Sequence, residues 1–442
     1  MAELHMGALA RKHNLTSILA ALEALPDRLH DTYDDVMDRI VGQGGEEVGL
    51  AMATLTWVVY AREKLTPKQI EHAVATTSEL KKLSKYDLTH VDHLILLCCG
   101  IVTEDKESGT VRLVHYTTQE YFERTGSKWF PDAQNFIVTT CLKYITLASA
   151  GKIYSSMTGE PEGIDEAGLL CSDDESSENA GEDLDERKQH TDSVEYPPLE
   201  AIDELENESE RAPRANRDGS DESTQLRDYP LLDYAIHFWG VHAQDDAISG
   251  ITQNSVLEFL EDEANRKYWV RTLEAYYPTR IAFEITKIPA TCVAAIFGLE
   301  EIVGRLLQSG GSVSDISLPY KETPLHWATL FGHVSVVRKL LSNGADVEAR
   351  SDDWTALHIA AVFDYVDIAQ TLLQNGADVN ATSSNEHWKE VTAMSLAKYN
   401  GSVKVEEVLL KHGFVGTSES EGWSTWTYGG LGNRFRRRVF GR

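Results

Sequence analysis

The sequence predicts a mainly helical protein whose C-terminal part is a solenoid of tandem helical repeats. The segment TPLHWA at 323–328 aligns with TALHIA at 355–360, and GADV at 344–347 aligns with GADV at 376–379, both with an offset of 32 residues. A fixed period of this length indicates a repeat architecture, in which each unit buries its apolar face against its neighbours. Most other apolar segments of the chain also have helical spacing.

Two further units extend the repeat in both directions. The segment TAMSLA at 392–397 continues the pattern after an insertion near 383–390. The segment AAIFGLEEIVGRLLQSG at 294–310 aligns with ATLFGHVSVVRKLLSNG at 328–344. We therefore expect four units over residues 289–415.

The residue types inside one unit have physical reasons. Thr323 is a good N-cap, and Pro324 occupies the first helical position, where no N–H partner is needed. Gly344 suits the left-handed backbone that ends a helix. Asp364 stands where the preceding unit has Gly332, and aspartate tolerates a left-handed turn better than most residues. The apolar stripe that adjacent units are expected to bury is Leu325, Ala328, Val336, Val337, Leu340 and Leu341.

This pattern resembles the ankyrin repeat, with its TPLHxA segment, Gly-His turn, V-V-x-x-LL helix and GADV segment. The resemblance implies a solenoid that binds proteins through hairpin tips and a concave inner face. It also implies that His326 and His358 bond neighbouring backbone and fix a turn, so these histidines are not expected to be catalytic. Lys321 lies where the repeat usually has a glycine, so the first hairpin is expected to be irregular.

The positions outside the repeat pattern are the expected partner-binding residues. Ankyrin proteins recognise partners through such positions, and exposed aromatic side chains beside charges are typical hot spots of protein interfaces. In this chain they are Tyr320, Lys321, Glu322, Leu330, Phe331, Asp352, Asp353, Trp354, Val362, Phe363, Trp388 and Tyr399.

The N-terminal half predicts several helices and one hairpin. A helix starting at Pro67 has the clearest start signal, with Thr66 as N-cap and proline at its first position. A turn at 106–110 that contains Gly109 separates two expected strands. The expected helices are 15–40, broken at Pro26, then 46–62, 65–74, 88–99 and 117–124, and the expected strands are 101–104 and 111–115. This order describes a winged-helix-like domain over residues 26–150.

Three N-terminal segments, LPDRLHDTYDDVMDRI, LTWVVYAREKLTPKQIEHAVA and VRLVHYTTQEYF, resemble the winged-helix part that follows the nucleotide-binding domain in fungal NACHT/STAND proteins. Many of those proteins end in ankyrin repeats. The segment YPLLDYAIHFW at 229–239 resembles the helix that opens their ankyrin region, and 252–284 is helical by periodicity, so residues 228–288 are expected to form a helical adaptor. Residues 1–25 are expected to be a helical remnant of the preceding module.

No P-loop, GxxxxGK[ST], occurs in the sequence, and such a loop is what cradles nucleotide phosphates in a NACHT domain. The glycine cluster at 42–45 lacks the Lys-Ser/Thr pair. Two interpretations of the chain are therefore retained. The chain is a separate interaction scaffold, or it is the regulatory and sensing half of a STAND signal-transduction NTPase.

Charge is concentrated in one segment. The chain has a formal net charge of −29, and residues 151–222 alone hold 23 acidic and 6 basic residues. Few large apolar residues occur there, so we expect a disordered acidic linker over residues 151–227. A net negative protein repels nucleic acid and anionic membranes. A DNA-binding regulator is the third, weaker interpretation, because the helix at 89–99 contains no Lys or Arg for phosphate contacts.

Residue patterns for catalysis or metal binding are missing from the sequence. The five cysteines, Cys98, Cys99, Cys141, Cys171 and Cys292, have no disulfide-framework or zinc spacing, which indicates reduced thiols. The longest apolar run, 50–61, is shorter than the ~20 residues that span a bilayer. We expect a non-enzymatic protein with no cofactor, metal, membrane or small-molecule substrate. The expected location is the cytoplasm, with the nucleus as an alternative because residues 416–442 form a basic tail.

Overall fold

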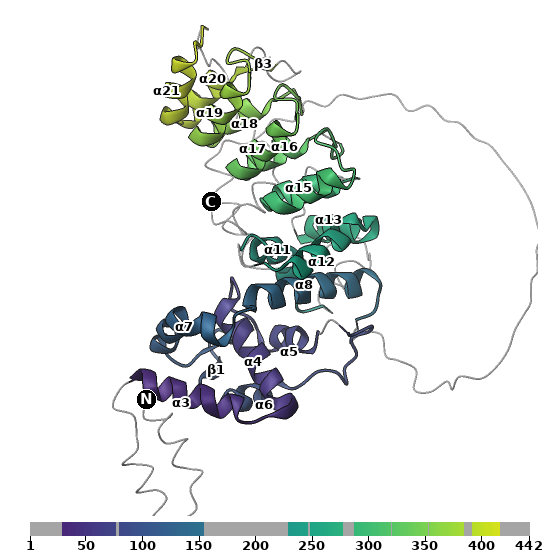
Figure 1. Ribbon diagram of the computed structural model, residues 1–442, viewed down its shortest axis with the longest axis vertical. Coiled ribbons are helices and arrows are strands. Elements are labelled where there is room, and N and C mark those ends of the chain that lie inside the picture. The colour runs from purple at the N-terminus through teal and green to yellow at the C-terminus, as the bar shows by residue number, and fades with distance from the viewer. Residues whose placement is uncertain are drawn as a thin grey trace, which may run out of the picture. The chain divides into compact units, whose positions relative to one another are not determined.

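The computed structural model describes residues 29–76, 79–153, 229–245, 248–276, 287–319, 321–351, 353–383 and 391–415. These residues are mainly helical, with two short two-stranded sheets (Figure 1). The expected helical remnant at 1–25, almost all of the acidic linker at 151–227 and the tail at 416–442 lie outside the described residues.

The first part of the described chain is a set of helices around one hairpin. Strands β1 and β2 pair in antiparallel register, Val102 opposite Leu113, and the backbone N–H of Val111 donates to the carbonyl of Leu65. The elements are α3 (Leu29–Val41), α4 (Gly45–Tyr60), α5 (Pro67–Ala75), α6 (Val91–Leu97), β1 (Val102–Asp105), β2 (Thr110–Leu113), α7 (Tyr116–Trp129) and α8 (Ala133–Ser149). The order expected from the sequence is confirmed within these residues, while α8 was not predicted. The winged-helix assignment itself stays a prediction.

The N-cap expected at the start of α5 is confirmed. The Thr66 hydroxyl accepts from the backbone N–H of Gln69, and the Gln69 carboxamide oxygen accepts from the N–H of Thr66 at 2.8 Å. This reciprocal pair satisfies two backbone donors that the first turn of a helix leaves open.

Helix α8 packs against the helices that precede the repeats, namely α11 (Leu232–His242), α12 (Gly250–Glu261) and α13 (Glu263–Tyr276). The Tyr234 hydroxyl accepts from the backbone N–H of Arg62 at 3.0 Å, and it bonds His242 at 2.7 Å. The other ring nitrogen of His242 bonds Gln134 on α8 at 2.6 Å. Burial lowers the pKa of His242 to about 3, so the ring is neutral. The N-terminal helices and helices α11 to α13 therefore share one core.

The repeat region consists of four helix pairs, as expected. The pairs are α14 (Ala290–Ile296) with α15 (Glu300–Gln308), α16 (Pro324–Leu330) with α17 (Val334–Ser342), α18 (Ala356–Val362) with α19 (Val366–Gln374), and α20 (Ala393–Asn400) with α21 (Val403–Lys411). Strands β3 (Thr382–Ser383) and β4 (Val391–Thr392) pair just before α20. Each first helix contacts the first helix of the next pair, and each second helix contacts the next second helix (Figure 1).

Two buried histidines connect successive pairs. The Nδ1 atom of His326 accepts from the backbone N–H of Thr323 at 3.2 Å, and its Nε2 bonds the carbonyl of Trp354 at 3.1 Å in the next unit. His358 repeats this arrangement, with Nδ1 toward Thr355 and Nε2 at 3.2 Å from the carbonyl of Val391. Burial lowers the pKa of both rings to about 4. The structural role that the ankyrin resemblance implies for these residues is thus confirmed.

Asp364 lies in the left-handed turn between the two helices of its unit. Gly332 has a φ of 79° and Gly401 a φ of 69°, and Asp364 occupies the equivalent position with a φ of 54°. Its carboxylate accepts from the backbone N–H of Val405 at 3.1 Å, in the first turn of α21. Asp364 therefore caps a helix of the following unit.

We expect Asp364→Ala to lower the free energy of unfolding by about 1–2 kcal/mol, because alanine keeps the unfavourable φ and loses the acceptor. Asp364→Asn keeps an acceptor and tolerates the turn, so its loss should stay within about 0.5 kcal/mol. Urea unfolding measures both values. Glu120→Ala, which changes an exposed carboxylate on α7, is the matched control. Equal stability of Asp364→Ala and the wild type would show that the bond to Val405 contributes nothing.

Candidate functional site

The expected contact positions on the first helices of the units differ strongly in exposure. Leu330, Val362 and Tyr399 occupy equivalent places on α16, α18 and α20. Leu330 is 2% exposed, Val362 is half-buried, and Tyr399 is 45% exposed. The prediction that Leu330 is an exposed contact residue is therefore wrong. The exposure of this position increases from the second to the fourth unit.

The next position along these helices behaves in the same way. Phe331 is buried, with its ring stacked 6.2 Å from Trp327 and 6.5 Å from His333. Phe363, one unit later, is half-buried and stacks 5.8 Å from Tyr365. The predicted exposure of Phe331 is wrong, because the ring forms part of an aromatic cluster of its own unit. Phe363 keeps part of its surface exposed.

Trp354 was expected at an exposed hairpin tip and is buried instead. Its backbone N–H and carbonyl bond Ser351 at 2.8 and 2.9 Å, and the same carbonyl bonds His326. The indole ring lies 6.2 Å from the His358 ring. Trp354 thus holds two units together, and alanine at this position would remove buried packing.

The charged tip residues Lys321, Glu322 and Asp353 are exposed or half-buried, as expected for contact residues. Lys321 is exposed with a φ of 63°, and Asp353 is half-buried with a φ of 67°, so both take the conformation in which glycine is usual. The Arg350 guanidinium holds Asp353 through an ion pair of 3.0 Å and donates to the carbonyl of Thr382 at 2.9 Å. Glu322 accepts from the Ser317 hydroxyl at 2.7 Å. Lys321 and Asp353 occupy equivalent tip positions with the same left-handed backbone, so the irregular first hairpin expected at Lys321 stays a prediction.

We use the term tip and inner-helix surface for the exposed and half-buried members of the predicted set, which are Lys321, Glu322, Asp353, Val362, Phe363 and Tyr399. These residues lie on consecutive units whose first helices pack against each other. Tyr320, Asp352 and Trp388 lie outside the described residues. The surface combines aromatic side chains with charges of both signs.

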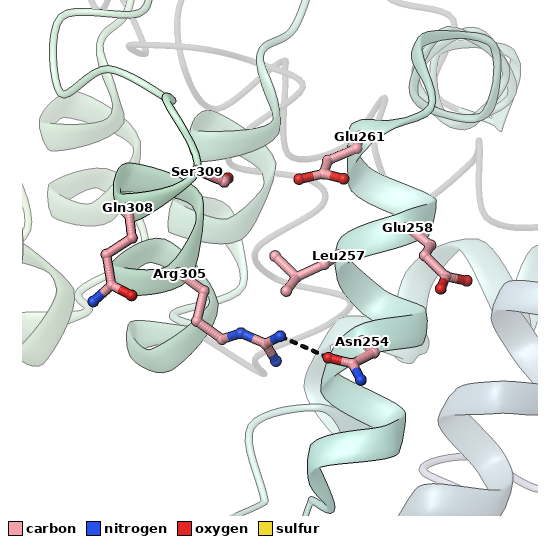
Figure 2. A pocket seen from close by; sticks show the side chains of 7 residues that line it. All are labelled: Asn254, Leu257, Glu258, Glu261, Arg305, Gln308 and Ser309. Carbon is pink, nitrogen blue, oxygen red and sulfur yellow. Dashed lines mark hydrogen bonds between the residues drawn. The ribbon is translucent and has the colours of Figure 1, made fainter.

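A groove between α12 and α15 was not predicted. It has a volume of about 460 Å³ and is lined by Asn254, Leu257, Glu258, Glu261, Arg305, Gln308 and Ser309. Figure 2 shows Arg305 reaching across the gap toward Asn254, and the Nη2 to Oδ1 distance is 2.6 Å. Leu257 and Glu261 also project toward α15 (Figure 2). No sequence pattern could reveal the groove, since its two helices are brought together only by tertiary packing.

Several buried or half-buried thiols and imidazoles are held in structural roles within the described part of the chain. Burial raises the pKa of the Cys98, Cys141 and Cys292 thiols, so they are protonated at neutral pH. His333 is half-buried, with a pKa that desolvation lowers to about 4, and its Nε2 bonds the carbonyl of Ile296 at 2.9 Å. Residues 29–76, 79–153 and the other described ranges bring together no group of three metal-ligating side chains. Among these same residues, every helix is too short or too polar to cross a membrane.

Comparison with known families identifies one region. The family described as ankyrin repeats (3 copies) matches residues 291–383. That match covers α14 to α19, while α20 and α21 follow it in the same arrangement. No curated protein matches the chain. Residues 291–383 are therefore ankyrin repeats, and the expectations of a NACHT/STAND type and a fungal origin receive no support from the comparisons.

Proposed function

We propose that this chain is a non-enzymatic scaffold that binds another protein through the tip and inner-helix surface of its ankyrin repeats. Ankyrin repeats generally mediate protein–protein interactions. The observation that carries the proposal is the 45% exposed ring of Tyr399 on α20, a helix that packs against α18, which half-buried Phe363 directly follows. Aromatic side chains of this kind are the usual anchors of protein interfaces.

Hydrogen bonds hold the surface before a partner arrives. His326 connects the second unit to the third, His358 connects the third to the fourth, and Asp364 caps a helix of the fourth unit. The tip carboxylates of Glu322 and Asp353 are already held by Ser317 and Arg350. A preorganised surface loses little conformational entropy on binding, which favours affinity.

The non-enzymatic part of the proposal is supported by the state of the nucleophilic and acid–base groups. The imidazoles of His326, His333 and His358 bond backbone atoms and are neutral, and the described thiols with raised pKa values are buried. General acid–base or nucleophilic catalysis needs such groups within reach of a substrate.

Partner capture by the full chain tests the proposal. Lys321→Glu with Tyr399→Ala should weaken binding of the captured partner at least about tenfold, because it removes one anchor and reverses one tip charge. Lys85→Glu with Tyr86→Ala is the matched control, since Tyr86 is 82% exposed and lies next to a lysine in the N-terminal part. Equal affinity of both double variants would contradict the proposed surface, provided that their melting temperatures equal that of the wild type.

The sensing half of a STAND NTPase remains a second proposal, which rests on the resemblance of the N-terminal segments. The described order of α3 to α7 around one hairpin is compatible with it. The scaffold proposal predicts no binding of ATP or GTP in calorimetry with the full chain. A DNA-binding role has less support, because α6 carries no Lys or Arg.

A further inference from the structure

The second helix of the last repeat exposes apolar side chains at positions that are partly buried in the earlier repeats. Val334 and Leu341 on α17 and Val366 and Leu373 on α19 are partly buried and pack against the core. The equivalent residues on α21 are Val403, which is 60% exposed, and Leu410, which is 62% exposed. Seven residues separate them, so they lie on one side of the helix two turns apart. We call Val403 and Leu410 the end face.

The helix cap of the last repeat differs from the caps of the two preceding repeats. Ser395 stands where the earlier units have His326 and His358. Its hydroxyl accepts from the backbone N–H of Thr392 at 2.9 Å, which closes the cap within the unit. The earlier histidines also reach a carbonyl of the following unit, and serine is too short to do so. The fourth unit therefore lacks the histidine bond with which the second and third units reach the following unit, and its end face is apolar.

We propose that residues 416–442 of this chain dock on the end face and act as its cap. This segment follows directly from the last repeat, where Phe414 packs against the core and the N–H of Val415 donates to Asn380 at 3.0 Å. It contains large apolar residues that a solvated tail does not need. These are Trp423, Trp426, Tyr428, Leu431, Phe435, Val439 and Phe440.

The spacing and charge of the segment fit this face. Leu431, Phe435 and Val439 recur every four residues, which is the spacing of one side of a helix. Arginines occur at 434 and 436–438 between them. On α21, Glu406 and Glu407 lie between Val403 and Leu410, and the ammonium groups of Lys404 and Lys411 flank the same helix. The carboxylates at the centre of the face complement the arginines.

The size of the face favours a tethered occupant over a second copy of the chain. Two half-exposed aliphatic side chains are far less than the ~800 Å² per partner that a stable protein interface buries. Residues 416–442 are covalently joined to the last repeat, and such a linkage raises their effective concentration at the end face. Weak contacts are therefore sufficient for an intramolecular cap.

Limited trypsin cleavage of the full chain tests the cap. Trypsin cuts after the arginines at 434–438, and docking should protect these bonds. Val403→Glu with Leu410→Glu should accelerate their cleavage at least about fivefold. Leu96→Glu with Ile251→Glu, which changes two side chains of similar exposure elsewhere, should leave the rate unchanged. The milder pair Val403→Ser with Leu410→Gln should give an intermediate rate if the glutamate pair does not fold.

Hydrogen exchange supplies the reciprocal measurement. Leu431→Glu with Phe435→Glu should speed exchange in α21 and leave exchange in α14 and α16 unchanged. Cleavage rates and α21 exchange that are the same in all variants would overturn the proposal. A dimer that the end-face substitutions dissociate, with unchanged cleavage at 434–438, would assign the end face to a second copy and would equally overturn it. None of these outcomes depends on whether the tip and inner-helix surface binds a partner.

Discussion

Phe297→Ala is expected to lower the free energy of unfolding by about 3–5 kcal/mol, the range for a fully buried aromatic residue. Phe297 follows α14 in the first repeat and is 0% exposed. Its ring lies 4.7 Å from Trp239 on α11 and 5.8 Å from Trp269 on α13. Its carbonyl accepts from the Gln244 side chain at 2.6 Å. The residue therefore joins the helical adaptor to the repeats, and its loss should uncouple their unfolding.

Phe363→Ala is the matched control, because it removes the same side chain from a half-buried position of the third unit. Its cost should be clearly smaller, about 1–2 kcal/mol. Gly240→Ala tests the same contact between α11 and the first repeat, because a methyl group at Gly240 would overlap the Phe297 ring. Urea unfolding followed by tryptophan fluorescence and by circular dichroism measures all three. Similar losses in the free energy of unfolding for Phe297→Ala and Phe363→Ala would show that Phe297 does not connect α11 and α13 to the repeats.

Acidification between pH 6.5 and pH 4 is expected to destabilise the repeats by about 3 kcal/mol for each of the buried histidines His326 and His358, and by less for half-buried His333. Burial lowers the pKa of His326, His333 and His358 from 6.5 to about 4. The unfolded chain therefore binds protons in this interval while the folded chain does not. Stability is fully present above pH 6.5 and is lost as the pH falls toward 4.

Variants can assign this pH dependence. His358→Gln removes one titrating group, so the slope of the unfolding free energy between pH 6.5 and pH 4 should fall by about one proton. Gln374→Ala, which changes an exposed side chain of α19 that does not titrate, should leave the slope unchanged. Urea unfolding at half-unit steps of pH gives both slopes. A stability curve that is flat over this interval would contradict the neutral state of the three rings.

The repeat architecture could be predicted because its signals are local. Threonine caps, the proline at 324 and the left-handed turn residues act within a few positions of the chain, and the period of 32 residues repeats them. The histidine roles followed from the ankyrin resemblance. The capping bond from Asp364 to Val405 was not foreseen, because it joins residues 41 positions apart.

The binding surface could be predicted only in part. Pattern positions identify where a partner can contact an ankyrin repeat, but exposure depends on neighbouring side chains. Leu330, Phe331 and Trp354 are buried by aromatic neighbours and by bonds between units, whereas Tyr399 on the last unit stays exposed. The groove between α12 and α15 combines residues from two helices about 50 positions apart, so it has no sequence signal.

Hydrogen exchange of the full chain, alone and with its captured protein partner, tests binding by the tip and inner-helix surface. A partner bound to this surface should slow exchange at the tips around 321–322 and 353 and along α18 and α20 near Phe363 and Tyr399. Exchange in α3 to α7 should not change. Protection confined to residues 29–153, with unchanged exchange throughout the repeats, would contradict binding by the tip and inner-helix surface.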